Sequence, residues 1–116
     1  MELVNVRVKY IRPEYQNLKD WCDDPNNEYI GRAGVVFING QRYPKKSSVF
    51  ANPFTVRKYG RYEAIEKYRE YIINKIENEN MMDELLSLQN KRLGCWCAPD
   101  PCHGDVLIEL IDKYKN

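Results

Sequence analysis

The stretch GCWCAPDPCHGD, residues 94–105, holds three of the four cysteines of this chain and its only histidine. It joins the last predicted strand, residues 91–96, to the last predicted helix. Side chains alternate across a strand, so we expect Cys95 and Cys97 on one face of the sheet and Trp96 on the other. The stretch therefore places three thiols and an imidazole where a strand is followed by a helix.

The helix after this crossing is expected to begin at residues 102–105. Its apolar residues recur at spacings of three and four, which is typical of a helix packed on a core; they are Val106, Leu107, Leu110, Ile111 and Tyr114. We expect Asp100 to be the N-cap and Asp105, in the first turn, to complement the positive end of the helix dipole.

The first half of the chain predicts short strands separated by polar loops. Residues 3–8 are rich in β-branched side chains and predict a strand, with three valines on one face: Val4, Val6 and Val8. Residues 17–27 are polar and predict a loop or a short helical turn, and residues 28–32 predict a second short strand. Asn39-Gly40 then predicts a β-hairpin near residues 35–43, because a type I′ turn needs positive φ at both central residues.

The second half of the chain predicts helices. From Arg61 onward the apolar residues follow a helical period: Ile65, Tyr68, Ile72 and Ile76. Residues 81–88 predict a shorter helix, whose expected buried set is Met82, Leu85 and Leu86. Strands alternating with helices predict an α/β fold, in which a short, mostly parallel sheet is flanked by helices and the hairpin is an insertion. We expect one domain over residues 1–116, with ligands bound beyond the carboxyl ends of the strands.

The composition is that of a soluble globular protein, with 43% apolar and 30% charged residues. Eighteen basic residues against seventeen acidic ones leave a formal charge of +1, which indicates neither a nucleic acid nor a membrane as partner. No apolar run reaches the length of a membrane span, and the N-terminus does not resemble a signal peptide. We therefore expect a cytoplasmic protein, in a compartment where disulfides are disfavoured.

Four explanations compete for Cys95, Cys97, Cys102 and His103. Their number and type suit a structural zinc site, so a zinc-stabilised protein-interaction module is one alternative. Their close spacing argues against zinc, because neighbouring side chains such as Cys102 and His103 tend to point apart; we expect no metal and no other cofactor. A disulfide such as Cys97–Cys102 is the second explanation, and simple packing of free cysteines is the third.

The fourth explanation is a ligand-binding or catalytic site. A helix N-terminus favours the thiolate of Cys102, and His103 beside it could act as a base. With Cys102 or Cys97 as the nucleophile, the chain would be a cysteine-dependent hydrolase or transferase. The free backbone N–H groups at the same terminus suit a phosphate, and Gly104 would let a ligand approach the backbone closely. Asp105 would repel a phosphate but could accept hydrogen bonds from a sugar or a base. This combination is typical of a site for a nucleotide-like molecule.

Three motifs resemble one known family, domain of unknown function 4326 (DUF4326), whose short members occur in bacteria, phages and large DNA viruses. They are Tyr29-Ile30-Gly31-Arg32, Asn52-Pro53-Phe54 and GCWCAPDPCHGDVL, and the resemblance covers nearly the whole chain. The resemblance implies an α/β fold whose motif residues gather at one site, but no activity. The chain departs from the family pattern at Ala51, where a glycine is usual, and in the longer segment 34–48, which contains the hairpin.

The resemblance adds Arg32 and Asn52 to the candidate residues. Arg32, at a strand end, could present a planar charged fork to an anion. Asn52 offers both a donor and an acceptor, although an Asn-Pro pair is also a common turn. Arg61 is a third, weaker candidate.

The leading hypothesis is a protein that binds a nucleotide-like or phosphorylated small molecule, and that senses, modifies or sequesters a nucleotide signal. If the chain is viral or from a phage, its place is the host cytoplasm. The expected ligand contacts are Arg32, Asn52, Cys95, Trp96, Cys97, His103, Gly104 and Asp105. The sequence leaves the oligomeric state open and does not decide whether the ligand reacts.

Overall fold

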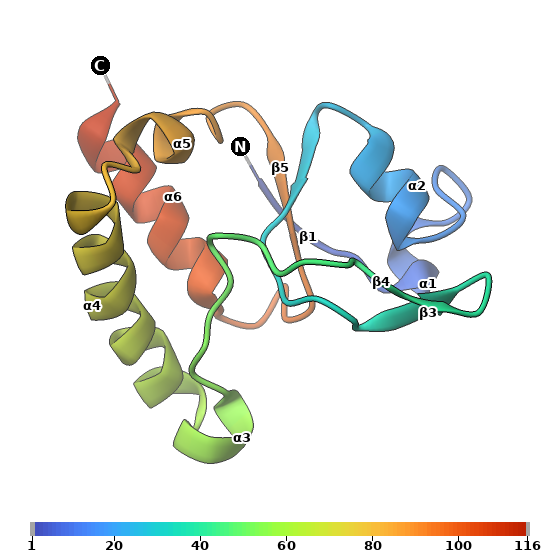
Figure 1. The fold of residues 1–116 in the computed structure, drawn as a ribbon, viewed down its shortest axis with the longest axis horizontal. Helices are drawn as coiled ribbons and strands as arrows, with labels where there is room; N and C mark the ends of the chain where they lie inside the picture. The colour runs from blue at the N-terminus through green and yellow to red at the C-terminus, as the bar shows by residue number, and fades with distance from the viewer. Residues whose placement is uncertain (1, 116) are drawn as a thin grey trace.

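A computed structural model of the chain describes residues 2–115, and a three-stranded parallel sheet lies at its centre (Figure 1). The middle strand is β5 (Arg92–Cys95), which pairs with β1 (Glu2–Asn5) on one side and with β2 (Asn27–Tyr29) on the other. All three strands run in the same direction, so their carboxyl ends meet where the stretch 94–105 begins. The expected α/β fold with a short parallel sheet is confirmed.

Helices cover both faces of this sheet in two layers (Figure 1). On one face lie α4 (Arg61–Asn78), α5 (Met82–Leu86) and α6 (His103–Tyr114), which contact one another. On the other face lie α1 (Val8–Ile11) and α2 (Leu18–Asp23). Each layer has its own apolar core, and the sheet separates the two. Within the described residues, no helix is both long enough and apolar enough to cross a bilayer.

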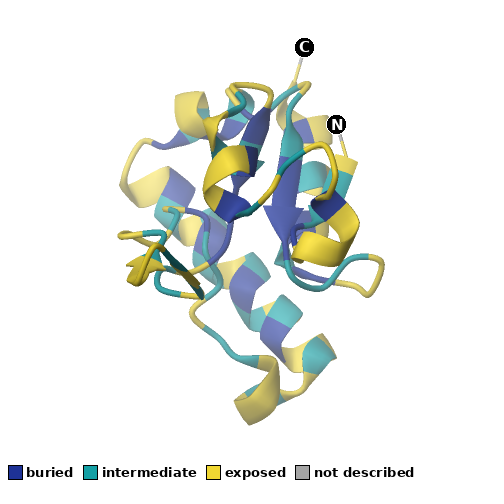
Figure 2. Cartoon of the chain, turned by 90° about the vertical axis from the view of Figure 1, so that its right-hand side faces the viewer, coloured by how far each residue is buried: buried dark blue, intermediate teal, exposed yellow. Residues whose placement is uncertain are grey.

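Side chains along the end of β5 alternate between the two cores. Leu93 and Cys95 are buried in the core beneath α4, α5 and α6, and Cys97 packs against the same core. Trp96 packs on the opposite side, against the core formed with α1 and α2. The expected facing of the two cysteines and the tryptophan is confirmed. Figure 2 shows the buried strands in the middle, with the exposed residues on the outer faces of the helices.

The predicted hairpin is also confirmed. Strands β3 (Val36–Ile38) and β4 (Gln41–Tyr43) pair antiparallel and form a small sheet of their own. The turn between them has φ of 52° at Asn39 and 79° at Gly40, the positive values that an Asn-Gly pair adopts with little strain. The hairpin therefore stands apart from the parallel sheet, as an insertion.

The first strand is shorter than predicted, because pairing ends at Asn5. The amide of Asn5 donates to the carbonyl oxygen of Ala98, 2.9 Å away, and its carboxamide oxygen accepts from the backbone N–H of Arg7. These bonds turn the chain out of the sheet, so Val8 starts α1 and is 43% exposed. Its expected place on the strand face was wrong.

The polar segment 17–27 contains α2, which begins where the side chain of Asn17 accepts from the backbone N–H of Asp20. The helical stripes of the second half are confirmed, with small shifts. Buried positions in α4 are Ala64, Tyr68, Ile72 and Ile76, while Ile65 is half-buried. Leu85 is the buried residue of α5, with Met82 and Leu86 half-buried, and the last stripe residue, Tyr114, is exposed.

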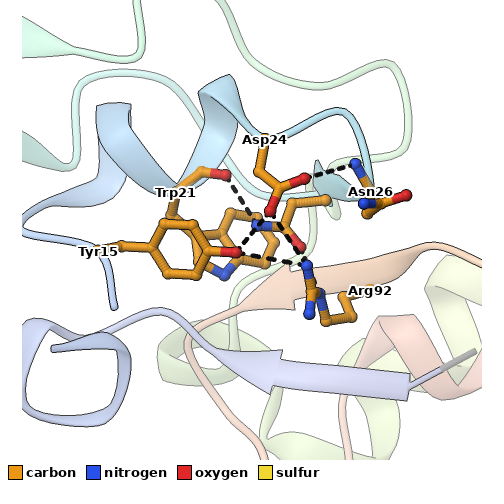
Figure 3. Close-up of polar contacts among 6 residues, drawn as sticks. Tyr15, Trp21, Asp24, Asn26 and Arg92 are labelled. Atoms are coloured by element: carbon orange, nitrogen blue, oxygen red, sulfur yellow. Dashed lines mark hydrogen bonds and ion pairs between the residues drawn. The ribbon is translucent and has the colours of Figure 1, made fainter. Parts of the chain in front are cut away.

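A polar network holds α2 at the start of β5, away from the stretch 94–105 (Figure 3). The guanidinium group of Arg92 donates through Nε to Asn27 (2.6 Å) and through Nη2 to the carboxylate of Asp24 (3.2 Å). The hydroxyl of Tyr15 donates to the same carboxylate at 2.6 Å. The amide of Asn27, a buried polar side chain, donates in turn to the carbonyl oxygen of Trp21 at 2.9 Å.

This network predicts acid-sensitive stability through Asp24. The Tyr15 hydroxyl, then the backbone N–H of Asn26 and the charge of Arg92, lower the pKa of the Asp24 carboxyl from its ordinary value. The stabilisation is thus fully present above the unfolded pKa of about 4 and is lost as the pH falls through the lower folded value. We expect Asp24→Asn to melt below the wild type at pH 7 and the gap to shrink on acidification. Thermal melts followed by circular dichroism measure it; a gap independent of pH would contradict the assignment.

Candidate functional site

A pocket of about 310 Å³ opens at the carboxyl end of β5. Four segments line it: residues 31–35, 52–56, 61–65 and 95–103. Most of the walls are apolar or aromatic, and they include Val35, Phe54, Val56, Ile65 and Trp96. The expected place of a ligand in such folds, beyond the strand ends, is therefore where the pocket lies.

Most of the predicted site residues line this pocket. They are Arg32, Asn52, Cys95, Trp96, Cys97, Cys102 and His103. Gly104 and Asp105 do not line it. A Cβ atom on Gly104 would lie 2.3 Å from Cδ2 of Leu3, so this glycine allows α6 to pack on the sheet rather than admitting a ligand.

The N-cap of α6 is Cys102, so the prediction that Asp100 caps this helix was wrong. The sulfur of Cys102 accepts from the backbone N–H of Gly104 at 3.3 Å, and the carboxylate of Asp105 accepts from the backbone N–H of Cys102 at 3.0 Å. Asp100 instead donates its backbone N–H to the carbonyl oxygen of Cys97. The chain itself thus uses the N–H groups of Cys102, Gly104 and Asp105, which leaves little of this helix start for an anion.

Three thiols form the floor of the pocket. The thiol of Cys102 donates to the sulfur of Cys95 at 3.5 Å, and Cys97 lines the same pocket as both. All four cysteines of the chain are free. Hydrogen bonds to Cys95 and Cys97, together with burial, raise the pKa of Cys102. The pKa of Cys97 is lowered to about 6, mainly by the Cys102 thiol and then by the guanidinium group of Arg61. The pKa of Cys95 is lowered as well, to about 7, so Cys95 and Cys97 are favoured as thiolates over Cys102, and of these two only Cys97 is half-buried rather than buried.

Nε2 of His103 contacts the backbone. It lies 2.8 Å from the carbonyl oxygen of Ile30, which can only accept, so this nitrogen carries the proton. Burial lowers the pKa of His103, and its ring packs edge-on against Tyr68, 5.0 Å between centroids. Within residues 2–115, no three His, Cys, Asp or Glu side chains are grouped so that they could hold a metal ion.

The side chain of Arg32 is hydrogen-bonded to the backbone of Asn52. Nε of Arg32 donates to the carbonyl oxygen of Asn52 at 3.1 Å. Within the described chain its two Nη groups make no hydrogen bond, which leaves them for a ligand. The carboxamide oxygen of Asn52 accepts from the backbone N–H of Phe54 at 2.9 Å, so the turn-forming interpretation of this asparagine is supported.

Two hydrogen bonds connect Trp96, through Tyr29, to the backbone of Arg32. Its indole N–H donates to the hydroxyl of Tyr29 at 2.9 Å, and that hydroxyl donates to the carbonyl oxygen of Arg32 at 2.9 Å. The polar edge of the indole is thus used within the chain. Trp96 therefore offers a ligand its apolar ring rather than a hydrogen bond.

Sequence reasoning underrated Arg61 and missed the wall formed by α3 (Val56–Tyr59). Nη1 of Arg61 donates to the carbonyl oxygen of Pro101 at 2.8 Å, which brings the first turn of α4 to the cysteine loop. The signals for α3 are local: Thr55 accepts from the backbone N–H of Lys58, and Gly60 ends the helix with φ of 78°. Four residues are too few to show a helical period.

Comparison with known proteins finds viral relatives of this chain. A model of the family described as "Domain of unknown function (DUF4326)" matches residues 14–113. Uncharacterized protein R718 of Acanthamoeba polyphaga mimivirus is 36% identical over 98 residues, covering 74% of this chain and 69% of that protein. The uncharacterized 12.4 kDa protein in the nrdA-td intergenic region of Enterobacteria phage T4 is 37% identical over 54 residues, or 46% of this chain and 50% of that protein. No solved structure matches the chain.

Proposed function

The chain belongs to the DUF4326 family, and from this premise we propose that its pocket binds a nucleotide-like or otherwise phosphorylated small molecule. One observation carries the proposal: Arg32 and Arg61 meet at a pocket whose other walls are largely apolar or aromatic. Guanidinium groups bind phosphate through paired, charge-assisted hydrogen bonds. Apolar and aromatic walls accept the flat, less polar part of such a ligand.

The distribution of charge along the chain supports an anionic ligand. Between Tyr29 and Tyr62 lie seven of the eighteen basic residues and none of the seventeen acidic ones. This segment therefore carries +7, and the remainder, with eleven basic and seventeen acidic residues, carries −6. The same segment supplies Arg32, Arg61 and the α3 wall of the pocket. A local field of this sign attracts anions although the net charge of the chain is close to zero.

The relatives suggest where such binding would matter. One is encoded by a large DNA virus and the other by a bacteriophage. A small protein of this kind acts in the host cytoplasm, where it senses or sequesters a nucleotide signal. Binding alone suffices for this role, because occupancy removes the free ligand or changes the surface of the protein.

Two measurements test the proposed function. Native mass spectrometry of the purified protein reports any ligand retained from the cell as an added mass. Isothermal titration calorimetry then follows AMP, ADP and ATP, with adenosine and inorganic phosphate as the two halves of the ligand. We expect at least one nucleotide to bind more tightly than either half. No retained mass, together with dissociation constants all weaker than about 1 mM, would overturn the proposal.

The Arg32 side chain gives a sharper prediction. If its two Nη groups bind phosphate together, Arg32→Lys should weaken the tightest-binding nucleotide of the panel almost as much as Arg32→Ala does. We expect about a 10- to 100-fold loss in both, since a point charge cannot replace the planar fork. The matched control is Arg57→Lys, on α3 but outside the pocket lining, which should change little. Wild-type affinity in Arg32→Lys would remove Arg32 from the site.

A further inference from the structure

The three thiols on the pocket floor differ in access. Cys95 and Cys102 are buried, whereas Cys97 is half-buried and lines the pocket. The sulfur of Cys102 is 3.5 Å from that of Cys95, and Cys102 lines the same pocket as Cys97. A small reagent that enters the pocket therefore meets the half-buried Cys97 first, with the buried thiol of Cys102 in the same lining.

A fixed cation lies beside Cys97. Arg61 lines the same pocket as Cys97, its charge helps to lower the pKa of the Cys97 thiol, and its guanidinium group is held by the carbonyl oxygen of Pro101 at 2.8 Å. The carboxylate of Asp100 lies farther from this guanidinium, at 3.9 Å. An opposite charge beside a sulfur favours the thiolate, which is the nucleophilic form.

Cys22 provides an internal contrast. It is half-buried like Cys97, but it lies in the other layer of the fold, on α2. Burial raises the pKa of the Cys22 thiol, and the nearby carboxylates of Asp23 and Glu28 add to the rise, whereas Cys97 is shifted the opposite way. Two thiols of similar exposure thus differ in their electrostatic surroundings.

We propose that Cys97 is a modification site that reacts with hydroperoxides, and that Cys102 is the thiol that resolves the product. In the first step a sulfur electron pair of the Cys97 thiolate attacks the peroxide. An S–O bond forms, the O–O bond breaks, and the departing oxygen takes the electron pair and a proton from water. Cys97 is oxidised to a sulfenic acid, and the peroxide is reduced to water or an alcohol.

In the second step Cys102 closes a disulfide. Its thiol loses a proton, and its sulfur attacks that of Cys97. The S–S bond forms, the S–O bond breaks, and the departing hydroxide combines with the proton to give water. The sulfur of Cys102 now caps α6 by accepting from the backbone N–H of Gly104, so the disulfide alters both the helix start and the pocket floor. As a consequence that rests on the proposed function, the oxidised protein should bind its nucleotide more weakly.

Peptide mapping by mass spectrometry after limited treatment of the folded protein with hydrogen peroxide tests the chemistry. We expect a Cys97–Cys102 disulfide, formed at least about tenfold faster than any oxidation at Cys22, because a thiol of low pKa is mostly thiolate near neutral pH. Cys102→Ser keeps a good N-cap residue, so the fold should persist and the sulfenic acid at Cys97 should accumulate and be trapped by dimedone. Cys97→Ser should give neither product, and Cys95→Ser should give the Cys97–Cys102 disulfide as the wild type does.

Several results would overturn this assignment. They are oxidation of Cys22 as fast as Cys97, a disulfide between Cys95 and Cys102 in place of the expected one, and dimedone labelling of Cys102→Ser at another residue or at none. The chemistry is tested without any nucleotide. If the disulfide forms but no nucleotide of the panel binds, the proposed function fails while the assignment of Cys97 holds. If a nucleotide binds but the disulfide does not form, the assignment of Cys97 fails while the proposed function holds.

Discussion

Substituting alanine for Gly94 is expected to lower the free energy of unfolding by about 2–3 kcal/mol, the upper part of the usual range for overpacking a core. A Cβ atom at this position would lie 2.5 Å from Cη2 and 2.6 Å from Cζ3 of Trp21, and 2.8 Å from Cγ1 of Val6. Both neighbours are almost completely buried. The indole ring is rigid and packed on all sides, so the backbone of β5 must move instead.

A double-mutant cycle with Trp21 tests this contact directly. Trp21→Phe removes the two ring atoms that Cβ would meet but leaves Cγ1 of Val6, so Gly94→Ala should cost less in that background than in the wild type without becoming neutral. Urea unfolding of the wild type, both single variants and the double variant gives the four free energies needed. Equal cost of Gly94→Ala in both backgrounds would show that the ring does not limit the space at Gly94.

The packing of Gly94 bears on how the cysteine motif is understood. The family motif begins with this glycine and contains a second one, Gly104, whose Cβ would meet Leu3. Gly94 allows β5 to pack against Trp21, and Gly104 allows α6 to pack against Leu3. Neither glycine lines the pocket. A short motif can therefore combine residues that build the fold with residues that line a site, and only the structure separates them.

The sheet, the hairpin and the longer helices could be predicted because their signals are local. Alternation, helical period and the Asn39-Gly40 turn are all visible within about ten residues. The two four-residue helices, α1 and α3, show no period, and Val8 follows the pattern of the preceding strand although Asn5 has already turned the chain away. The cap of α6 depends on where the Cys102 sulfur lies in a thiol cluster, which no sequence pattern shows.

The candidate site was predicted in outline because the chain brings its motifs together at one sheet edge. The roles within it depended on distant contacts. Arg61 reaches the carbonyl oxygen of Pro101, forty positions away, and its charge is one of the causes that lower the pKa of Cys97. The basic segment between residues 29 and 62 is visible in the sequence, but the net charge of +1 conceals it.

Arg61→Met should change both the nucleotide affinity of the pocket and the reactivity of Cys97. It removes one of the two guanidinium groups that bind phosphate in the proposed function, so we expect the affinity for the tightest-binding nucleotide to fall about 10- to 100-fold. It also removes a cation that lowers the pKa of Cys97. The Cys97 pKa should therefore rise, and alkylation of Cys97 by iodoacetamide near neutral pH should slow.

Global stability should change little in this variant, which keeps the test interpretable. Arg61 is the first residue of α4, where a positive charge opposes the helix dipole, so losing it offsets part of the loss of the bond to Pro101. Arg57→Met removes the same charge from the neighbouring α3, outside the pocket lining, and should affect neither affinity nor alkylation. Calorimetry and alkylation rates read by mass spectrometry report the two effects separately. Slow alkylation with unchanged nucleotide affinity would show that Arg61 acts on the Cys97 thiol but does not bind the nucleotide. An equal loss of affinity and alkylation rate in Arg57→Met would show that both effects come from the overall positive charge of residues 29–62.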